Sequence, residues 1–406
     1  MELRPLGRTG LKIAPLVFGG NVFGWTADEK TSFALLSRFF EAGFNTVDTA
    51  DVYSSWAPGN SGGESEVIIG KWLKSGAVAR DKAIIVTKVG SDLGEGRKGL
   101  SQKWIMQAVE DSLKRLQTDY IDLYLSHWPD ASVPYEETLA AHTKLKEQGK
   151  VRAVGGSNLD ATQLQASLDA ATANGLQRYD VLQPEYNLYD RGGFEGPLAE
   201  LCQREDIGVI TYFSLASGFL TGKYRTPADT QGKARGEDAG KYLDAKGQRI
   251  LAALDTVSAQ TGAKPAEIAL AWLMAKPTVT APIASATSLS QLESLIKSAS
   301  LSLTSDQIAL LDKAGASNDK GRRSMPAPFG IPRMPLRNHS HSMVLISLSC
   351  LIYMGKIFFA LKTSVAETVK RVWLLISKRN LGDLQISRFR RQSISIGQLL
   401  AIRHQP

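Results

Sequence analysis

Four side chains capable of acid–base chemistry follow three successive apolar runs of the sequence. Asp48 and Tyr53 follow the first of these runs, Lys88 the second and His127 the third. Each of them alone could cap a turn, pack in the core or face solvent. Together, a carboxylate, a phenol, an ammonium and an imidazole suit the reduction of a carbonyl group, because the alkoxide left by hydride addition needs a proton as it forms.

The expected roles of these four residues follow from their acid–base properties. The phenol of Tyr53 is a weak acid with an ordinary pKa of about 10, and the neighbouring Lys88 cation is expected to lower that pKa by favouring the tyrosinate. Asp48 is expected to keep Lys88 charged, and His127 to orient the substrate oxygen. The sequence therefore predicts four catalytic residues, with Tyr53 as the proton donor.

A parallel barrel would bring these residues together. Eight short apolar runs alternate with amphipathic stretches of helical period, which indicates βα units and a parallel sheet. The runs are 16–18, 44–47, 83–86, 121–125, 151–154, 181–182, 209–210 and 279–283, and the helical stretches are 31–42, 103–116, 136–148, 162–173, 197–204, 249–261, 265–275 and 291–299. Eight units favour a (β/α)8 TIM barrel, in which catalytic groups lie at the carboxyl ends of the strands.

The main rival is a doubly wound open sheet. That fold would place a Gly-x-Gly-x-x-Gly turn directly after its first strand, and residues 17–21 lack this pattern. Residues 2–13 indicate an N-terminal β-hairpin around Gly7 and Gly10. Residues 216–246 show no sustained apolar period and are predicted to form a long loop after the seventh strand, where long loops are usually functional.

The composition is that of an ordinary globular protein. The chain has 406 residues, of which 43% are hydrophobic and 22% charged. Its two cysteines, Cys202 and Cys350, cannot build a disulfide framework. The first residues lack the apolar run of a signal peptide. We therefore expect a cytoplasmic protein.

The net charge of +8 is unevenly distributed. From residue 321 onward, 14 Lys and Arg residues stand against two acids, Glu367 and Asp383, so this tail carries +12 and residues 1–320 carry −4. The predicted barrel domain, residues 1–320, therefore gives no electrostatic sign of a nucleic-acid partner. The tail, residues 321–406, has a Pro-rich, linker-like start and an apolar segment at 343–361. We expect it to lie outside the fold, as a disordered extension or a non-native reading frame; the alternative is a membrane-associating appendage.

The motifs around the four residues resemble those of the aldo-keto reductase family. They are Asp-Thr-Ala-Asp-Val-Tyr at 48–53, Thr-Lys at 87–88 and Ser-His-Trp at 126–128, and the resemblance extends from about Leu3 to about Ala314. It implies an NAD(P)H-dependent enzyme that reduces aldehydes or ketones to alcohols, with Tyr53 as the proton donor. Ser54 departs from the pattern, since many members have Gly there.

The resemblance also implies a set of residues that bind the cofactor. They are Gly20, Asn21, Asp48, Ser157, Asn158, Gln183, Tyr212, Ser214, Leu215, Gly218, Lys223, Ser285, Thr287 and Gln291. Tyr212 would stack on the nicotinamide, residues 214–224 would cover the pyrophosphate, and residues 284–295 would hold the adenosine 2′-phosphate. Because Ser288 stands where many members have a cation or Asn, the choice between NADPH and NADH stays open.

Two other functions compete with the reductase. The family includes potassium-channel β subunits, which keep the same four residues, so a cofactor-binding regulatory subunit with little turnover is the alternative. A metal-dependent barrel hydrolase is disfavoured, because His127 and His142 are the histidines of the barrel domain and supply too few nitrogen ligands; we expect no metal. Trp25, Trp56 and Trp128 either line an aromatic pocket for a small carbonyl substrate or pack in the fold.

Overall fold

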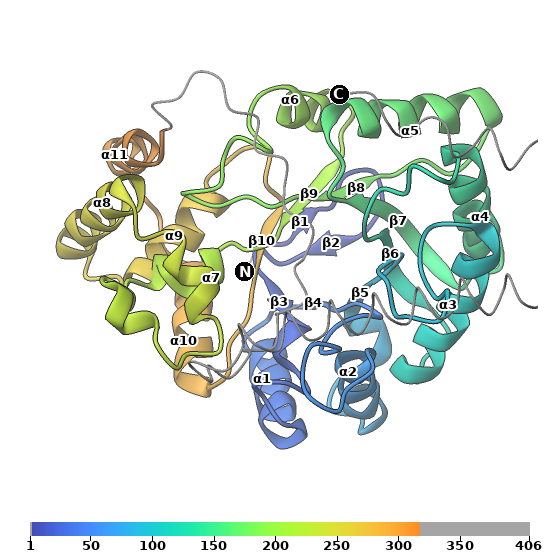
Figure 1. The fold of residues 1–406 in the computed structure, drawn as a ribbon, viewed down its shortest axis with the longest axis horizontal. Coiled ribbons are helices and arrows are strands. Elements are labelled where there is room, and N and C mark those ends of the chain that lie inside the picture. Colours follow the sequence, from blue (N-terminus) through green and yellow to red (C-terminus); the bar gives the residue numbers. More distant parts are fainter. Residues whose placement is uncertain (1, 317–406) are drawn as a thin grey trace, which may run out of the picture. The chain divides into compact units, whose positions relative to one another are not determined.

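Eight parallel strands form a closed barrel in the computed structural model, which describes residues 2–316 (Figure 1). The strands are β3 (Val17–Gly19), β4 (Thr46–Asp48), β5 (Ile84–Val89), β6 (Ile121–Ser126), β7 (Val151–Ser157), β8 (Val181–Gln183), β9 (Gly208–Thr211) and β10 (Ala281–Ala284). They pair in the order β10-β3-β4-β5-β6-β7-β8-β9, and β10 pairs with both β3 and β9. The predicted barrel is confirmed, and each predicted apolar run overlaps one strand.

Helices surround the barrel. They are α1 (Glu29–Glu41), α2 (Glu64–Lys74), α3 (Gln102–Leu116), α4 (Tyr135–Glu147), α5 (Ala161–Asn174), α6 (Pro197–Arg204), α8 (Ala245–Thr261), α9 (Pro265–Met274), α10 (Leu289–Ser298) and α11 (Ser305–Gly315). The sequence did not predict α2 or α11. On α2 the buried face includes Ser65, Glu66 and Gly70, so its apolar stripe is interrupted by residues that usually face solvent.

The predicted N-terminal hairpin closes one end of the barrel. It consists of β1 (Arg4–Pro5) and β2 (Lys12–Ile13), paired antiparallel. Leu6 and Ile13 are fully buried in the same apolar cluster as the inward-facing side chains of the strands, such as Val86 and Leu125. Gly7 has a φ of +51°, and a Cβ there would lie 2.4 Å from the backbone nitrogen of Gly208. The hairpin turn therefore depends on a glycine that lets two backbones approach.

Side chains of the barrel strands alternate between the barrel interior and the layer between strands and helices. On β5, Val86 belongs to the cluster inside the barrel and Ile85 to the cluster between strands and helices. Because successive side chains point to opposite faces, the residue two places after an inward-facing residue also points inward. This alternation determines which side chains reach the interior at the carboxyl end of each strand.

The segment after β9 contains short helical elements. The sequence predicted a long loop at 216–246, and the structure shows η3 (Ala216–Thr221), η4 (Pro227–Thr230) and α7 (Gly236–Gly240) within it. Two shorter 3-10 turns, η1 (Gly20–Val22) and η2 (Arg80–Lys82), lie elsewhere. Within residues 2–316, no helix has the length and apolar character needed to cross a bilayer. The predictions for the tail and the domain boundary at residue 320 fall outside the described residues.

Candidate active site

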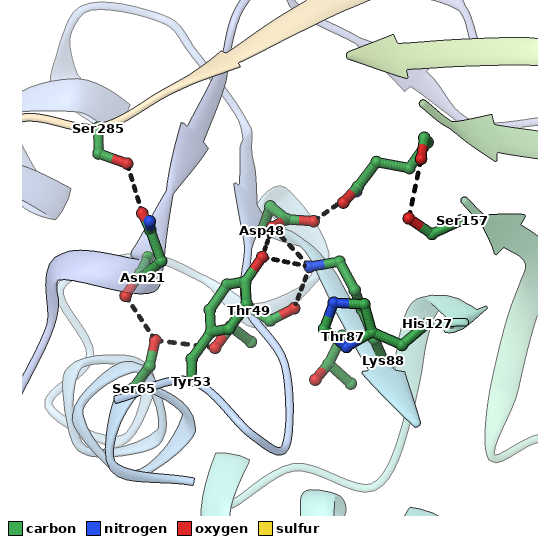
Figure 2. Close-up of polar contacts among 12 residues, drawn as sticks. Asn21, Asp48, Thr49, Tyr53, Ser65, Thr87, Lys88, His127, Ser157 and Ser285 are labelled. Carbon is green, nitrogen blue, oxygen red and sulfur yellow. Dashed lines mark hydrogen bonds and ion pairs between the residues drawn. The ribbon is translucent and has the colours of Figure 1, made fainter. Parts of the chain in front are cut away.

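The four predicted catalytic residues converge at the carboxyl end of the barrel (Figure 2). Asp48 is the last residue of β4, Lys88 lies near the end of β5, and His127 directly follows β6. Lys88 and His127 each come two places after an inward-facing residue, Val86 and Leu125. The alternation of the strands therefore turns these side chains into the barrel.

Lys88 is the centre of this arrangement. Its ammonium donates three hydrogen bonds: to Oδ1 of Asp48 at 2.7 Å, to the carbonyl oxygen of Thr49 at 2.7 Å and to the phenol oxygen of Tyr53 at 2.8 Å. An ammonium has three donors, so all of them are used. The Tyr53 hydroxyl in turn donates to Oδ1 of Asp48 at 3.1 Å. Carboxylate, ammonium and phenol thus form one closed hydrogen-bonded triangle.

Burial determines the acidity of this triangle. The side chain of Lys88 is 0% exposed, and burial lowers its pKa, while Asp48 opposes that change. The pKa of Tyr53 is well above its usual value because of burial first and the charge and hydrogen bond of Asp48 second. The prediction that Lys88 lowers the pKa of Tyr53 is therefore wrong. Asp48 adds negative charge against the tyrosinate, and Tyr53 is a fully protonated phenol at neutral pH.

His127 is a neutral imidazole beside the phenol. Its ring centroid lies 6.2 Å from that of Tyr53. Burial, followed by the charge of Lys88, holds the pKa of His127 well below its usual range. Its Nδ1 pairs with the hydroxyl of Ser91 at 2.9 Å, and the backbone N–H of His127 donates to Val89 at 2.8 Å. The ring is therefore held in place and uncharged.

Four predicted cofactor residues form a chain of contacts that begins at Asp48. Gln183 donates from Nε2 to Oδ2 of Asp48 at 2.7 Å. Ser157 donates to the backbone oxygen of Gln183 at 2.8 Å, and Asn158 donates to Ser157 at 3.1 Å. The phenol of Tyr212 donates to Oδ1 of Asn158 at 2.6 Å. The structure thus brings together residues from three strand ends, as the sequence predicted.

On the other side of Asp48, the turn after β3 contacts the residue that follows β10. Ser285, which follows β10, donates to Oδ1 of Asn21 at 2.7 Å. A Cβ at Gly20 would lie 2.9 Å from the backbone oxygen of Asp48, so the turn needs glycine there. Ser65 donates to the carbonyl of Gly20 at 2.8 Å and links α2 to this turn (Figure 2).

The segment after Tyr212 has an unusual backbone. Phe213, Ala216 and Ser217 have φ angles of 52°, 48° and 54°, in the left-handed region. Such positions cost of order 1–3 kcal/mol each and often mark functional sites. The hydroxyl of Ser214 is buried and donates to Thr211 at 3.0 Å; Leu215 is the N-cap of η3.

Lys223 and the start of α10 offer groups that suit phosphates. The ammonium of Lys223 lies over Gly218, where it would be 3.4 Å from an added Cβ. The backbone N–H and the hydroxyl of Thr287 donate to Oε1 of Gln291 at 2.9 and 3.1 Å. Both residues lie at the N-terminus of α10, and a helix N-terminus favours anions.

Arg235 was missed by the sequence interpretation. It lies in the segment after β9, and its guanidinium carbon is 5.5 Å from the ring centroid of Trp25. Its Nη2 is buried and has no hydrogen-bond partner among residues 2–316. Its charge lowers the pKa of Tyr53, against the larger effects of burial and Asp48. In the sequence, Arg235 is one arginine in a long predicted loop, and this alone does not indicate a binding role.

The three tryptophans lie around the phenol and the imidazole. Trp25 packs edge to face on Trp56 with ring centroids 5.8 Å apart, and Trp56 lies 6.0 Å from Tyr53. Trp128 stacks on His127 at 5.8 Å. Ser54, where the resemblance expects Gly, has a φ of 72° and donates to the carbonyl of Phe23 at 2.6 Å. Among residues 2–316, no three His, Cys, Asp or Glu side chains are grouped as metal ligands would be.

The chain is similar to known proteins over most of its length. The model of the aldo/keto reductase family matches residues 15–316. An uncharacterized oxidoreductase, YrpG, of Bacillus subtilis is 34% identical over 319 residues, covering 77% of this chain and 95% of that protein. A probable voltage-gated potassium channel subunit beta of Oryza sativa is 33% identical over 299 residues, covering 72% and 89%. The aldo-keto reductase AMT2 of Alternaria alternata is 31% identical over 343 residues, covering 76% and 90%.

These matches support a general oxidoreductase role. The chain belongs to the aldo/keto reductase family.

Proposed function

We propose that the protein is an NAD(P)H-dependent reductase that converts aldehydes or ketones to alcohols, with Tyr53 as the proton donor. The observation that carries this proposal is the buried triangle of Asp48, Tyr53 and Lys88, with the neutral ring of His127 beside it. A protonated phenol next to a fixed cation suits one task, which is to give a proton to an oxygen anion as that anion forms.

The residues present fit a nicotinamide dinucleotide. Nη2 of Arg235 is buried with no hydrogen-bond acceptor among residues 2–316, and the ammonium of Lys223 lies beside Gly218. A pyrophosphate would supply the acceptors that this guanidinium lacks. Tyr212 would stack on the nicotinamide, with Ser157, Asn158 and Gln183 around its amide. The bound cofactor supplies the hydride.

The chain's own residues then handle the proton. His127 and Tyr53 hold the carbonyl oxygen by hydrogen bonds. As the oxygen gains negative charge, the O–H bond of Tyr53 breaks and the proton passes to the oxygen, which leaves an alcohol and a tyrosinate. Lys88, 2.8 Å away, stabilises that tyrosinate. Asp48 balances the charge of Lys88, and the phenol recovers its proton from solvent.

The alternative is a cofactor-binding regulatory subunit. The similarity to the rice channel subunit favours it, and the four residues do not separate the two functions. The distinguishing property is turnover.

The test is oxidation of NADPH and of NADH by the purified full chain with a panel of aldehydes and ketones, followed by near-ultraviolet absorbance. Oxidation that depends on the carbonyl compound supports the reductase and ranks the two cofactors. Tight cofactor binding with negligible turnover across the panel would reject it in favour of the regulatory subunit.

A further inference from the structure

Ser91 meets the ring of His127 from the turn after β5. The strand ends at Val89, and Gly90 follows with a φ of +115°, a conformation that suits glycine. The next residue is Ser91, whose hydroxyl lies 2.9 Å from Nδ1 of His127 in a buried contact. The carbonyl oxygen of Val89 accepts the backbone N–H of His127 at 2.8 Å. The end of β5 therefore holds both the backbone and the ring of His127.

The surroundings of His127 favour an uncharged ring. The residue is 4% exposed, and its ring lies beside Lys88 and Tyr53 (Figure 2). Among residues 2–316, no carboxylate forms a hydrogen bond with the ring, so an imidazolium would be a second, uncompensated cation beside Lys88. Burial and the charge of Lys88 accordingly hold the pKa of His127 below its usual range. A neutral imidazole has one N–H and one lone pair, so one of two tautomers must be chosen.

The hydrogen bonds around the ring favour one tautomer. Ser91 is 8% exposed, and Nδ1 of His127 is the one partner of its hydroxyl within the described part of the chain. If Nδ1 carried the hydrogen, the hydroxyl would accept it, and both the hydroxyl's own proton and the lone pair of Nε2 would be unpaired. If the hydroxyl donates to Nδ1, the N–H of Nε2 alone is left to pair. Because an unpaired buried donor is costly, the second arrangement is preferred.

We propose that Ser91 is a positioning residue for the proposed reduction: its hydroxyl donates to Nδ1 of His127 and thereby places the ring hydrogen on Nε2. The inference rests on the proposed function, in which His127 holds the carbonyl oxygen by a hydrogen bond. Nε2–H can give that hydrogen bond, which strengthens as the oxygen gains negative charge. The other tautomer would turn a lone pair toward the oxygen and repel it.

The first test determines the tautomer in the full chain with isotope-labelled histidine. NMR of the ring nitrogens distinguishes a nitrogen that carries hydrogen from one that does not, and the resonances of His127 are assigned by their loss in His127→Gln. We expect hydrogen on Nε2 and none on Nδ1 at neutral pH. Hydrogen on Nδ1, or on both nitrogens, would overturn the inference.

The second test removes the hydroxyl in Ser91→Ala and keeps it in Ser91→Thr. In Ser91→Ala both tautomers become populated, so the two nitrogen resonances of His127 should move toward each other. We expect kcat to fall about 3–30-fold, less than the roughly 10²–10³-fold cost of removing such a donor, because part of the productive tautomer remains. The Kd of NADPH should not change. Ser91→Thr should keep the resonances, and its kcat should stay within about twofold.

Unchanged resonances or unchanged kcat in a folded Ser91→Ala would overturn the inference. If that variant does not fold, the tautomer of the unmodified chain still decides, because the first test needs no substitution at Ser91. The expected tautomer without any carbonyl-dependent turnover would reject the proposed function and leave the hydrogen bond between Ser91 and His127 standing.

The matched control is Ser126→Ala. Ser126 precedes His127, so its side chain points the other way, and its hydroxyl is buried 3.1 Å from Nε2 of another histidine, His142. The control thus removes the same group from a similar serine–histidine contact. We expect the resonances of His127 and kcat to stay as in the unmodified chain. Equal changes in Ser126→Ala and Ser91→Ala would overturn the specific role of Ser91.

Discussion

The ammonium nitrogen of Lys88 lies 2.8 Å from the phenol oxygen of Tyr53, although the two residues are 35 positions apart in the chain. A strand end and the turn after the preceding strand bring them together, and both are buried. In the proposed mechanism, this contact gives Tyr53 a cation that stabilises the tyrosinate. Several properties of the protein follow from this contact and from the fold that holds it.

Replacing Lys88 by Met should abolish most of the turnover. The variant keeps the length of the side chain but removes the cation, so the tyrosinate is no longer stabilised; we expect kcat to fall by about 10²–10⁴-fold. Asp48 would also lose its ion-pair partner, at a cost of about 3–5 kcal/mol in the free energy of unfolding. Steady-state kinetics and urea unfolding measure the two effects.

The control for that variant is Lys82→Met. Lys82 lies in the exposed turn η2, 4.0 Å from Asp81, and exposed ion pairs contribute little. We expect both kcat and unfolding to be unchanged. Equal kcat values in Lys88→Met and the unmodified chain would contradict the role given to Lys88.

Arg235→Met should weaken cofactor binding. If its buried guanidinium meets a phosphate, removing hydrogen bonds to a charged group should raise the Kd of NADPH by about 10–100-fold. The matched control is Arg225→Met, from the same segment, because Arg225 already pairs with Asp255 at 2.7 and 2.8 Å. Titration calorimetry gives both affinities. A Kd that rises equally in the two variants would argue against a specific contact with Arg235.

Gly7→Ala should destabilise the barrel far more than Gly10→Ala. Both glycines have positive φ angles, +51° and +77°, but an added Cβ meets backbone atoms of Gly208 and Asp180 only at Gly7, and nothing within 4 Å at Gly10. The difference between the variants therefore isolates the crowding at the hairpin turn, which we expect to cost about 1–3 kcal/mol. Denaturant unfolding measures it. Equal losses would mean that the hairpin does not need this close approach.

The stability of the fold should fall in mild acid because of His142. It is fully buried, and burial lowers its pKa from 6.5 to about 4. The unfolded chain thus takes up a proton below about pH 6.5 that the folded chain refuses until about pH 4. Stability due to this group is complete at neutral pH and is lost as the pH falls through that window.

His142→Gln should remove this dependence. Between about pH 7.5 and pH 5 we expect the unmodified chain to lose about 2 kcal/mol more stability than the variant. His127 is present in both chains, so its own titration cancels in the difference. Parallel pH dependences would show that His142 is accessible to protons in the folded state.

Much of the site could be predicted from the sequence because strands impose a simple rule. Inward-facing positions alternate, so the first polar residue two places beyond Val86, Leu125 or Val181 reaches the interior. Lys88 and His127, which the sequence places at the ends of apolar runs, obey this rule. The cofactor residues came from the resemblance, and their binding role stays a prediction.

Other features of the site could not be predicted from the sequence. Thr49 contributes a backbone carbonyl, which no side-chain pattern reveals, and Ser91 reaches His127 from the loop after β5. Arg235 lies in a segment with no periodic pattern. The direction of the pKa of Tyr53 was predicted wrongly, because the distance to Asp48 was unknown and burial could not be weighed against Lys88.

The most direct test of the central proposal is Tyr53→Phe. This change removes one oxygen from the triangle and keeps the ring that packs near Trp56 and His127. Single-turnover reduction of an aldehyde by bound NADPH should slow by about 10²–10⁴-fold while the Kd of NADPH stays within about twofold. Reduction at the unmodified rate would contradict the assignment of Tyr53 as the proton donor.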